Sequence, residues 1–257
     1  MAVLTDFFCD NLHVRVFDTR AAMGGCAGRE AAACLRSLLE QKAVINVMFA
    51  AAPSQNETLA MLCSDPTIDW RRINAFHMDE YVGLDPAHPA GFRNFLKRAI
   101  FDRKPFRSIH LLDGNAADPH VEALRYDRLL RKHPLDVCLL GIGENGHIAF
   151  NDPPVADFSD PYFVKVVTLD ERCRMQQVND GCFDSIEQVP KRALSVTVPG
   201  LMQAGKLFCT VPAATKADAI RHTLNDGIST ACPATILRTH AHAALYVDAD
   251  AGKYILS

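Results

Sequence analysis

Short apolar runs alternate with amphipathic stretches along almost the whole of this 257-residue chain. The runs are bounded by turn residues and rich in Val, Ile, Leu and Phe, which is typical of strands buried in a parallel sheet, and the stretches between them have helical periodicity. Strands are expected at 12–17, 44–50, 73–78, 108–112, 135–140, 193–198, 207–211 and 243–247, and helices at about 19–41, 54–62, 92–100, 121–132 and 215–224. This alternation predicts an α/β fold with a doubly wound, mostly parallel sheet and helices on both faces.

No internal repeat, low-complexity tract or linker rich in Pro, Gly or Ser interrupts the alternation. We therefore expect a single domain over residues 1–257 with a Rossmann-like arrangement. The least regular segment is 153–190, which is polar and lies between expected strands. A polar segment of this kind beside strand ends is a candidate lid over a site.

Composition narrows the class of partner. The net charge is −3 and no basic run occurs, which argues against nucleic acid as the main partner. No segment approaches the ~20 apolar residues that span a bilayer, and the N-terminal stretch does not resemble a secretory signal. The nine cysteines are odd in number and form no CxxC pair. Reduced thiols in a cytoplasmic protein are therefore favoured over disulfides or a zinc site.

The turn after the strand at 44–50 is the first candidate site, because ligands of open α/β sheets bind beyond the carboxyl ends of strands. A small-residue turn that runs into a helix start can hold an anion on free backbone N–H groups. Ser54, Gln55 and Asn56 are the candidate anion-binding residues there. The segment 54–57 also fits a capping box, and an ordinary helix cap is the simpler interpretation of it.

Charged residues follow two further strands. Asp79 and Glu80 follow 73–78 and are expected at the rim of a cleft, where Asp79 is a candidate base for removing a proton beside a carbonyl. It could equally well cap the next turn. Lys216 follows 207–211 at a helix start, which is unfavourable with the helix dipole unless an anion such as phosphate is bound. A solvated lysine is the alternative.

The loop after 135–140 carries the most information. It reads GIGENGHIAFND, and glycines such as Gly143 and Gly146 let backbone approach a ligand closely. No regular helix follows, so this is not a dinucleotide-binding fingerprint. His147 can act as an acid or base near neutral pH, and Asp152 could orient its ring. A single histidine is more often structural, but the glycines, the strand end and the nearby Asp152 favour a functional role.

Taken together, these segments resemble the glucosamine-6-phosphate deaminase family, within a wider group that includes the 6-phosphogluconolactonases. The matching stretches are 76–84 with 88–89, 141–153, 189–194, 215–217 and 232–237 with 240. The resemblance covers the chain from residue 44 onward, and more loosely the first strand and helix. It implies conversion of an amino-hexose 6-phosphate, from glucosamine or galactosamine, to a ketose 6-phosphate and ammonia, with no metal or redox cofactor.

The resemblance also implies roles for individual residues. Asp79 matches the base that moves a proton between C2 and C1, and His147 matches the residue that opens the sugar ring. Asp152 stands where the family has a glutamate paired with this histidine, and Lys216 matches a phosphate ligand. Backbone N–H groups of the glycine loop would stabilise the negative charge of the enediol or enolamine.

Three positions depart from the family pattern. Asn145 stands where the family usually has an aspartate, and because an amide cannot act as a base, this change bears on the deamination step. Glu57 would repel phosphate if it faced the ligand. A phosphate-binding arginine of the family's lid has no clear match: Asn179 aligns with it, and Arg174 is the nearest candidate.

Alternative functions follow from these departures. They are a phosphosugar isomerase without deamination, a lactone hydrolase, and a sugar-phosphate sensor without activity. The segments 78–81 and 151–153 match the deaminase branch better than the lactonase branch. Sensors of this group carry a DNA-binding helix pair, for which no stretch is spare. A small-molecule sugar phosphate is thus the expected partner, and a homo-oligomer is possible.

Overall fold

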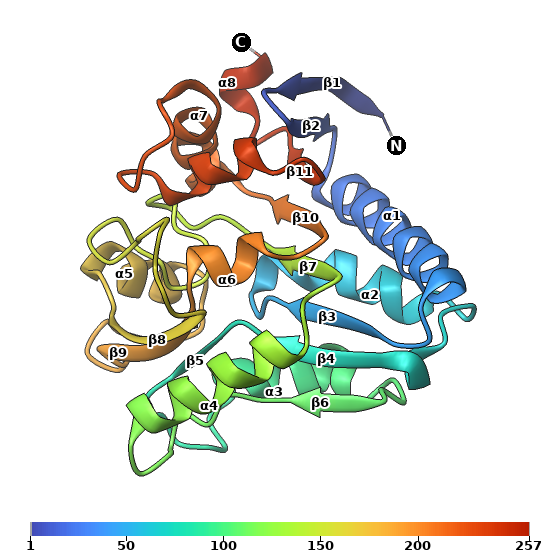
Figure 1. Ribbon diagram of the computed structural model, residues 1–257. Coiled ribbons are helices and arrows are strands. Elements are labelled where there is room, and N and C mark those ends of the chain that lie inside the picture. The colour runs from blue at the N-terminus through green and yellow to red at the C-terminus, as the bar shows by residue number, and fades with distance from the viewer. Residues whose placement is uncertain (1, 257) are drawn as a thin grey trace.

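The computed structural model describes residues 2–256 and contains a large sheet and a small one (Figure 1). The eight strands of the large sheet lie in the order β1-β2-β11-β10-β7-β3-β4-β6, and every neighbouring pair is parallel except the hairpin of β1 with β2. Their bounds are β1 Val3–Cys9, β2 Leu12–Phe17, β3 Ile45–Phe49, β4 Ile73–His77, β6 Ser108–His110, β7 Val137–Leu140, β10 Lys206–Val211 and β11 Ala243–Asp248. The doubly wound, mostly parallel sheet expected from the sequence is confirmed.

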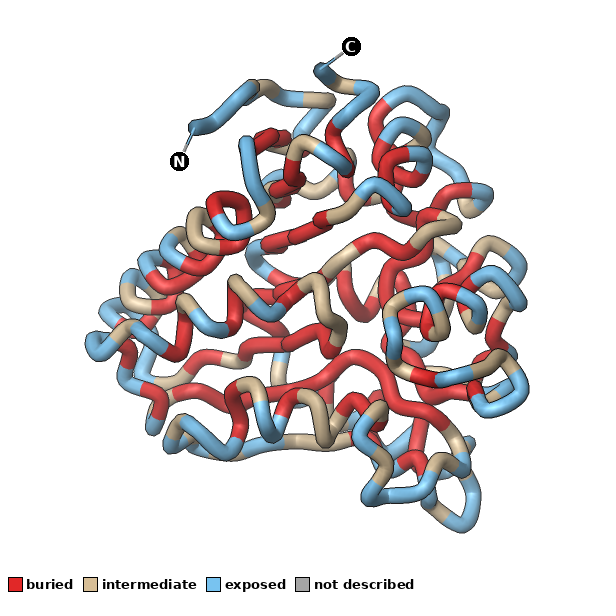
Figure 2. Tube along the Cα trace, turned by 180° about the vertical axis from the view of Figure 1, so that it is seen from behind, coloured by how far each residue is buried: buried red, intermediate tan, exposed pale blue. Residues whose placement is uncertain are grey.

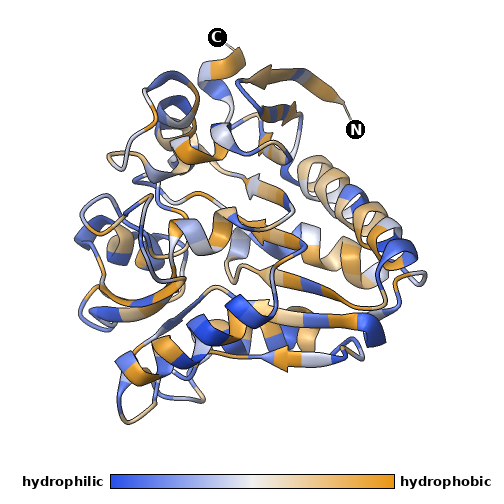
Figure 3. Ribbon diagram, viewed as in Figure 1, coloured by the Kyte–Doolittle hydropathy of each residue, from blue (hydrophilic) through white to orange (hydrophobic). Residues whose placement is uncertain are grey.

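Helices cover both faces of this sheet. The apolar cluster on one face contains residues of α1, α2 and α3, and the cluster on the other contains residues of α4, α6 and α7. Their bounds are α1 Arg20–Gln41, α2 Asn56–Ser64, α3 Phe92–Leu96, α4 Pro119–Lys132, α6 Val198–Met202 and α7 Ala217–Asn225. Figure 2 shows the central strands as buried, and Figure 3 shows polar and apolar residues interleaved along α4, as in a helix with one face against the core. No helix within 2–256 is long and apolar enough to span a membrane.

The small sheet corrects part of the expected topology. It is antiparallel, in the order β5 (Asp79–Tyr81), β9 (Arg192–Val196) and β8 (Val164–Thr168), so the strand expected at 193–198 lies outside the large sheet. The segment 153–190 is also less irregular than expected, because it contains β8 and α5 (Glu171–Asn179). That this segment closes as a lid, and that the chain is one domain, stay predictions.

Shorter elements complete the description. These are η1 Pro53–Gln55, η2 Trp70–Arg72, the π-helical turn η3 Lys97–Phe101, η4 Ala214–Lys216, η5 Pro233–Thr239 and α8 Lys253–Leu256. All nine cysteines are free thiols, as the sequence led us to expect.

The starts of α1 and α2 differ in how they are capped. The Thr19 hydroxyl accepts a hydrogen bond of 3.2 Å from the backbone N–H of Ala22 and so caps the start of α1. The capping box expected at 54–57 is wrong, because α2 begins at Asn56 without a side-chain cap. Glu57, which would have closed the box, instead pairs with the guanidinium of Arg20 at 2.8 Å. The start of α2 is therefore tied to the start of α1.

The order of strands creates a crevice beside β7. In the sheet, β3, β4 and β6 lie on one side of β7, and β10, β11 and β2 lie on the other. The loops that leave the carboxyl ends of β3 and β10 consequently diverge, and ligands of open α/β sheets bind at such a switch point.

Candidate active site

A cleft lies at this switch point. It is lined by the loops that follow β3, β4, β7 and β10, and by one side of α5. Of the sequence-predicted site residues, it brings together Ser54, Gln55, Asp79, Gly143, His147 and Lys216. The remaining ones, Asn56, Glu80, Asn145, Gly146, Asp152 and Arg174, do not line it.

Asp79 places a carboxyl group in the cleft without a hydrogen-bond partner from residues 2–256. The residue begins β5 directly after the end of β4 and is only 8% exposed. Burial, with a smaller contribution from the charge of Glu80, raises its pKa well above the usual value for an aspartate. A buried carboxyl that no protein group satisfies is suited to exchange a proton with a bound substrate.

The sequence prediction for Glu80 is wrong in two respects: the side chain is buried rather than at the rim, and it faces away from the cleft lining. Its carboxylate accepts backbone N–H groups of Tyr81, Phe92 and Arg93 at 3.0, 3.1 and 2.9 Å, and the Arg93 guanidinium lies 3.4 Å away. Burial raises the pKa of Glu80, and these donors only partly oppose that effect. Glu80 therefore fixes the start of α3 against β5.

Glu80→Ala should lower the free energy of unfolding by ~3–5 kcal/mol, because it leaves buried backbone donors without their acceptor and removes the buried carboxylate partner of Arg93. Urea denaturation of the purified variant measures the loss. The matched control is Glu187→Ala, since Glu187 is exposed on the surface and should unfold with the wild-type midpoint. Wild-type stability of Glu80→Ala would contradict the structural role.

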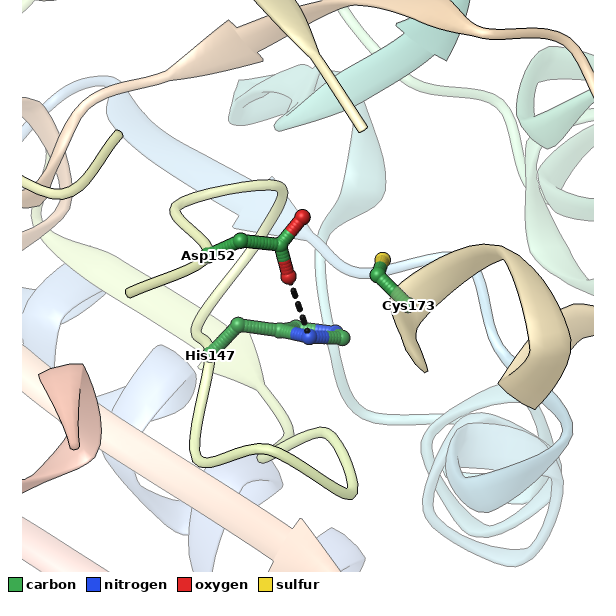
Figure 4. Close-up of side chains that lie close together, drawn as sticks. All are labelled: His147, Asp152 and Cys173. Carbon is green, nitrogen blue, oxygen red and sulfur yellow. Dashed lines mark ion pairs between the residues drawn. The ribbon is translucent and has the colours of Figure 1, made fainter. Parts of the chain in front are cut away.

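His147 lies in the same cleft and is held by Asp152, which Figure 4 shows beside it, and by Asn145. Its Nδ1 lies 3.0 Å from Oδ1 of Asp152 and 2.7 Å from Oδ1 of Asn145. Asn145 in turn donates its amide to Asp152 at 2.9 Å. Burial alone would raise the pKa of Asp152, but the hydrogen bond and charge of His147, with the Asn145 donor, lower it overall. With two acceptors facing Nδ1, we assign the proton to that nitrogen, which leaves Nε2 with a free lone pair.

Asn145 thus orients the histidine rather than handling protons. An amide meets the two demands of its position, since it accepts from His147 and donates to an ionised Asp152. Asp152 is fully buried and also accepts the backbone N–H of Asp170 at 3.1 Å, at the N-terminus of α5. The pairing of His147 with Asp152 expected from the sequence is present in the structure.

The loop glycines serve the histidine more than a ligand. A Cβ on Gly143 would lie 2.1 to 2.5 Å from atoms of the His147 ring, so only glycine lets the imidazole pack there. Gly146 has a φ of +81° and faces Cys232 outside the cleft. The close approach that the sequence suggested for a ligand is, at both positions, an approach of protein to protein.

Lys216 supplies a buried cation to the cleft. Its ammonium is buried in the cleft at the junction of η4 and α7, and it has no hydrogen-bond partner among residues 2–256. The nearest carboxylate oxygen, from Glu144, lies 3.7 Å away. Burial lowers the pKa of Lys216, which the charges of Asp180 and Glu144 partly oppose. A bound phosphate would satisfy both the ammonium and the helix N-terminus beside it.

Arg20, rather than Arg174, is the arginine of the cleft. Arg174 donates to the backbone carbonyls of Ile186 and Val189, so its guanidinium is committed to the turn before β9. Arg20 lines the cleft beside the 53–55 turn and contacts the Pro53 carbonyl. It also neutralises Glu57, so that residue does not present the unpaired negative charge that the sequence suggested.

The turn after β3 contributes Ser54 to the cleft but commits Gln55 to the fold. The Gln55 amide donates to the carbonyls of Leu140 and Thr210 at 3.2 and 3.4 Å, and so ties this turn to β7 and β10. Asn56 is exposed on α2 and points away from the cleft lining, so its predicted binding role is not supported. The difference arises because 53–55 forms a 3₁₀ turn and α2 begins one residue later than a Ser54 cap would require.

Several of the residues that line the cleft were not identified from the sequence. Arg20 follows β2, so the rule of inspecting each strand end would have found it. Gln176, Gln177 and Asp180 come from α5 or its C-terminal end and form one wall. Gln176 is fixed there, accepting the backbone N–H of Glu144 at 2.8 Å and donating to Asp180 at 3.3 Å. No sequence pattern indicated this wall, because its helix lies in the segment expected to be irregular.

Comparison with known proteins identifies the family. The family model of glucosamine-6-phosphate isomerases and 6-phosphogluconolactonases matches residues 18–246. The chain belongs to this family. Its members include the glucosamine-6-phosphate deaminase of Exiguobacterium sibiricum, which is 37% identical over 190 residues, 73% of each chain.

Solved structures of the glucosamine-6-phosphate isomerase/6-phosphogluconolactonase family share the fold. A monomeric glucosamine-6-phosphate deaminase is 27% identical, with a TM-score of 0.84 over 93% of this chain and 98% of its own. The 6-phosphogluconolactonase of Trypanosoma brucei is 18% identical, with a TM-score of 0.76 over 94% of this chain and 98% of its own. This second likeness extends to the fold alone.

Proposed function

We propose that this protein deaminates and isomerises an amino-hexose 6-phosphate, giving a ketose 6-phosphate and ammonia. The observation that carries the proposal is that the unpartnered carboxyl of Asp79 and the oriented imidazole of His147 open onto one cleft, which also holds the buried ammonium of Lys216 without a hydrogen-bond partner among residues 2–256. This is a general base, a second acid–base group and an anion anchor in one place. The 37% identity to a glucosamine-6-phosphate deaminase supports the same reaction.

The reaction proceeds in three stages: ring opening, proton transfer from C2 to C1, and hydrolysis of the resulting imine. Nε2 of His147 takes the proton of the C1 hydroxyl and returns one to the ring oxygen, which opens the ring. Asp79 then removes the proton from C2, which is acidified by the aldehyde, and delivers it to C1 of the resulting enolamine. Water adds to the imine at C2 and ammonia leaves, so substrate and one water become ketose phosphate and ammonia.

The phosphate is proposed to bind between Lys216 and the 53–55 turn. Lys216 and Arg20 are the Lys and Arg side chains that line the cleft within 2–256, and Ser54 adds a hydroxyl to the same lining. A dianionic phosphate at this position would compensate the desolvated ammonium of Lys216.

Lys216→Ala should raise KM by ~10²-fold while kcat falls much less, because a buried charged contact to the phosphate is removed and the reacting carbons are untouched. Steady-state kinetics on the amino-sugar phosphate measures the two constants separately. Lys206→Ala is the matched control, since Lys206 is an exposed lysine at the start of β10, the strand that Lys216 follows. An unchanged KM for Lys216→Ala would contradict the phosphate role.

A comparison of three substrates separates the alternative functions. The purified protein is incubated in turn with glucosamine-6-phosphate, galactosamine-6-phosphate and 6-phosphogluconolactone. Ammonia from an amino sugar supports the proposal and identifies the sugar, whereas acid released from the lactone alone would support the lactonase alternative. Ligand-induced thermal stabilisation without any product would support a sensor. A cytoplasmic location and the oligomeric state remain predictions.

A further inference from the structure

Cys173 lies beside the catalytic pair and has no place in the proposed reaction. Figure 4 shows its side chain projecting from α5 toward Asp152 and His147, which come from the loop after β7. One nitrogen of His147, one oxygen of Asp152 and the sulfur of Cys173 all lie within 4.8 Å of one another. All three side chains are buried, with Cys173 1% and Asp152 0% exposed.

These donors match the coordination chemistry of zinc. Imidazole nitrogen, thiolate sulfur and carboxylate oxygen are the ligands of protein Zn²⁺ sites, whereas Mg²⁺ and Ca²⁺ prefer oxygen alone. Tetrahedral zinc with bonds of ~2.0–2.3 Å separates its ligand atoms by ~3.3–3.8 Å, so a contraction of at most ~1–1.5 Å would close the site. His147 lines the cleft, so the fourth ligand could be a water molecule from the cleft.

The electrostatic surroundings favour a cation there. Burial raises the pKa of Cys173 well above that of an ordinary thiol, and the carboxyl groups of Asp152, Asp79 and Asp170 raise it further. The carboxylate of Asp152 attracts a divalent cation, and Lys216 is the opposing charge nearby. On binding, the Cys173 proton would leave to solvent, and a proton on the imidazole nitrogen that binds the metal would be released while the other ring nitrogen takes one up. The metal charge would stabilise the thiolate that remains.

We propose that His147, Asp152 and Cys173 form an inhibitory site for Zn²⁺. The bound ion occupies the carboxylate and the imidazole that the reaction needs, so the ring-opening step stops. Ser or Ala at position 173 would leave the catalytic pair intact and remove the metal site. The inhibition rests on the proposed function, but zinc binding itself does not.

The first measurement is zinc binding by the metal-free protein, in competition with a chromophoric chelator. Wild type should bind one Zn²⁺ per chain, and Cys173→Ser should bind it at least ~100-fold more weakly after loss of one of three protein ligands. The matched control is Cys182→Ser, since Cys182 lies close in sequence but outside the cluster and should leave binding unchanged. Cys173→Ala replaces the serine variant if that variant does not fold.

The second measurement is turnover with stoichiometric Zn²⁺. Wild type and Cys182→Ser should lose activity and regain it with EDTA, while Cys173→Ser should keep its activity throughout. Equal zinc affinity of wild type and Cys173→Ser, or no binding by wild type, would overturn the proposal. Cys173-dependent binding in a protein without deaminase activity would retain the metal site and reject the proposed reaction instead.

Discussion

Replacing Asp79 with asparagine is expected to lower kcat by ~10²–10⁴-fold or more, while ligand binding survives. Its carboxyl lines the same cleft as His147, and no group within 2–256 donates a hydrogen bond to it in the free protein. Asparagine keeps the shape and removes the basicity. Turnover of the variant is measured with the coupled product assay, and binding with a saturating phosphosugar in a thermal-shift experiment.

The same substitution should stabilise the protein at neutral pH. Because the folded pKa of Asp79 is raised above its unfolded value of 3.8, the native state holds the proton to higher pH than the unfolded state does. The free energy of unfolding therefore falls as the pH rises through that window, and Asp79→Asn removes the fall. The Tm difference between variant and wild type should grow with pH there. Turnover within tenfold of wild type would reject Asp79 as the base.

His147→Gln is expected to lower kcat by a similar ~10²–10⁴-fold, since an amide cannot exchange the ring-opening proton. The chain offers a close control in His222→Gln, because His222 also pairs with an aspartate, Asp226, at 2.8 Å but on the exposed surface of α7. Side-by-side kinetics on the closed-ring substrate should show loss in the first variant and wild-type rates in the second. Comparable rates in both variants would show that the His147 pair is structural.

The arrangement of the sheet and its strand ends was predictable from local pattern. Buried strands are marked by apolar runs, and in a parallel sheet their carboxyl ends share one edge, so Asp79, His147 and Lys216 could be placed together before any coordinates. The Thr19 cap of α1 likewise depends on a local interaction.

The residues whose positions were wrongly predicted from the sequence are held by partners distant in the chain. Glu80 accepts backbone N–H groups at the start of α3, and Arg174 donates to a carbonyl of the 186–189 turn. The Glu57 carboxylate pairs with Arg20, which lies 37 residues earlier in the chain. Strands β5 and β8 are short and half-polar, so their pairing with β9 had no clear signal. Tertiary contacts of this kind override local propensity.

The most direct test of the account is the ratio of products that the wild-type protein forms from glucosamine-6-phosphate or galactosamine-6-phosphate. Ammonia and ketose 6-phosphate are quantified in the same tube, beside Asp79→Asn. We predict equal amounts of the two products from one of these sugars, and almost none from the variant. Ketose phosphate without ammonia, or neither product from either sugar, would contradict deamination by this cleft.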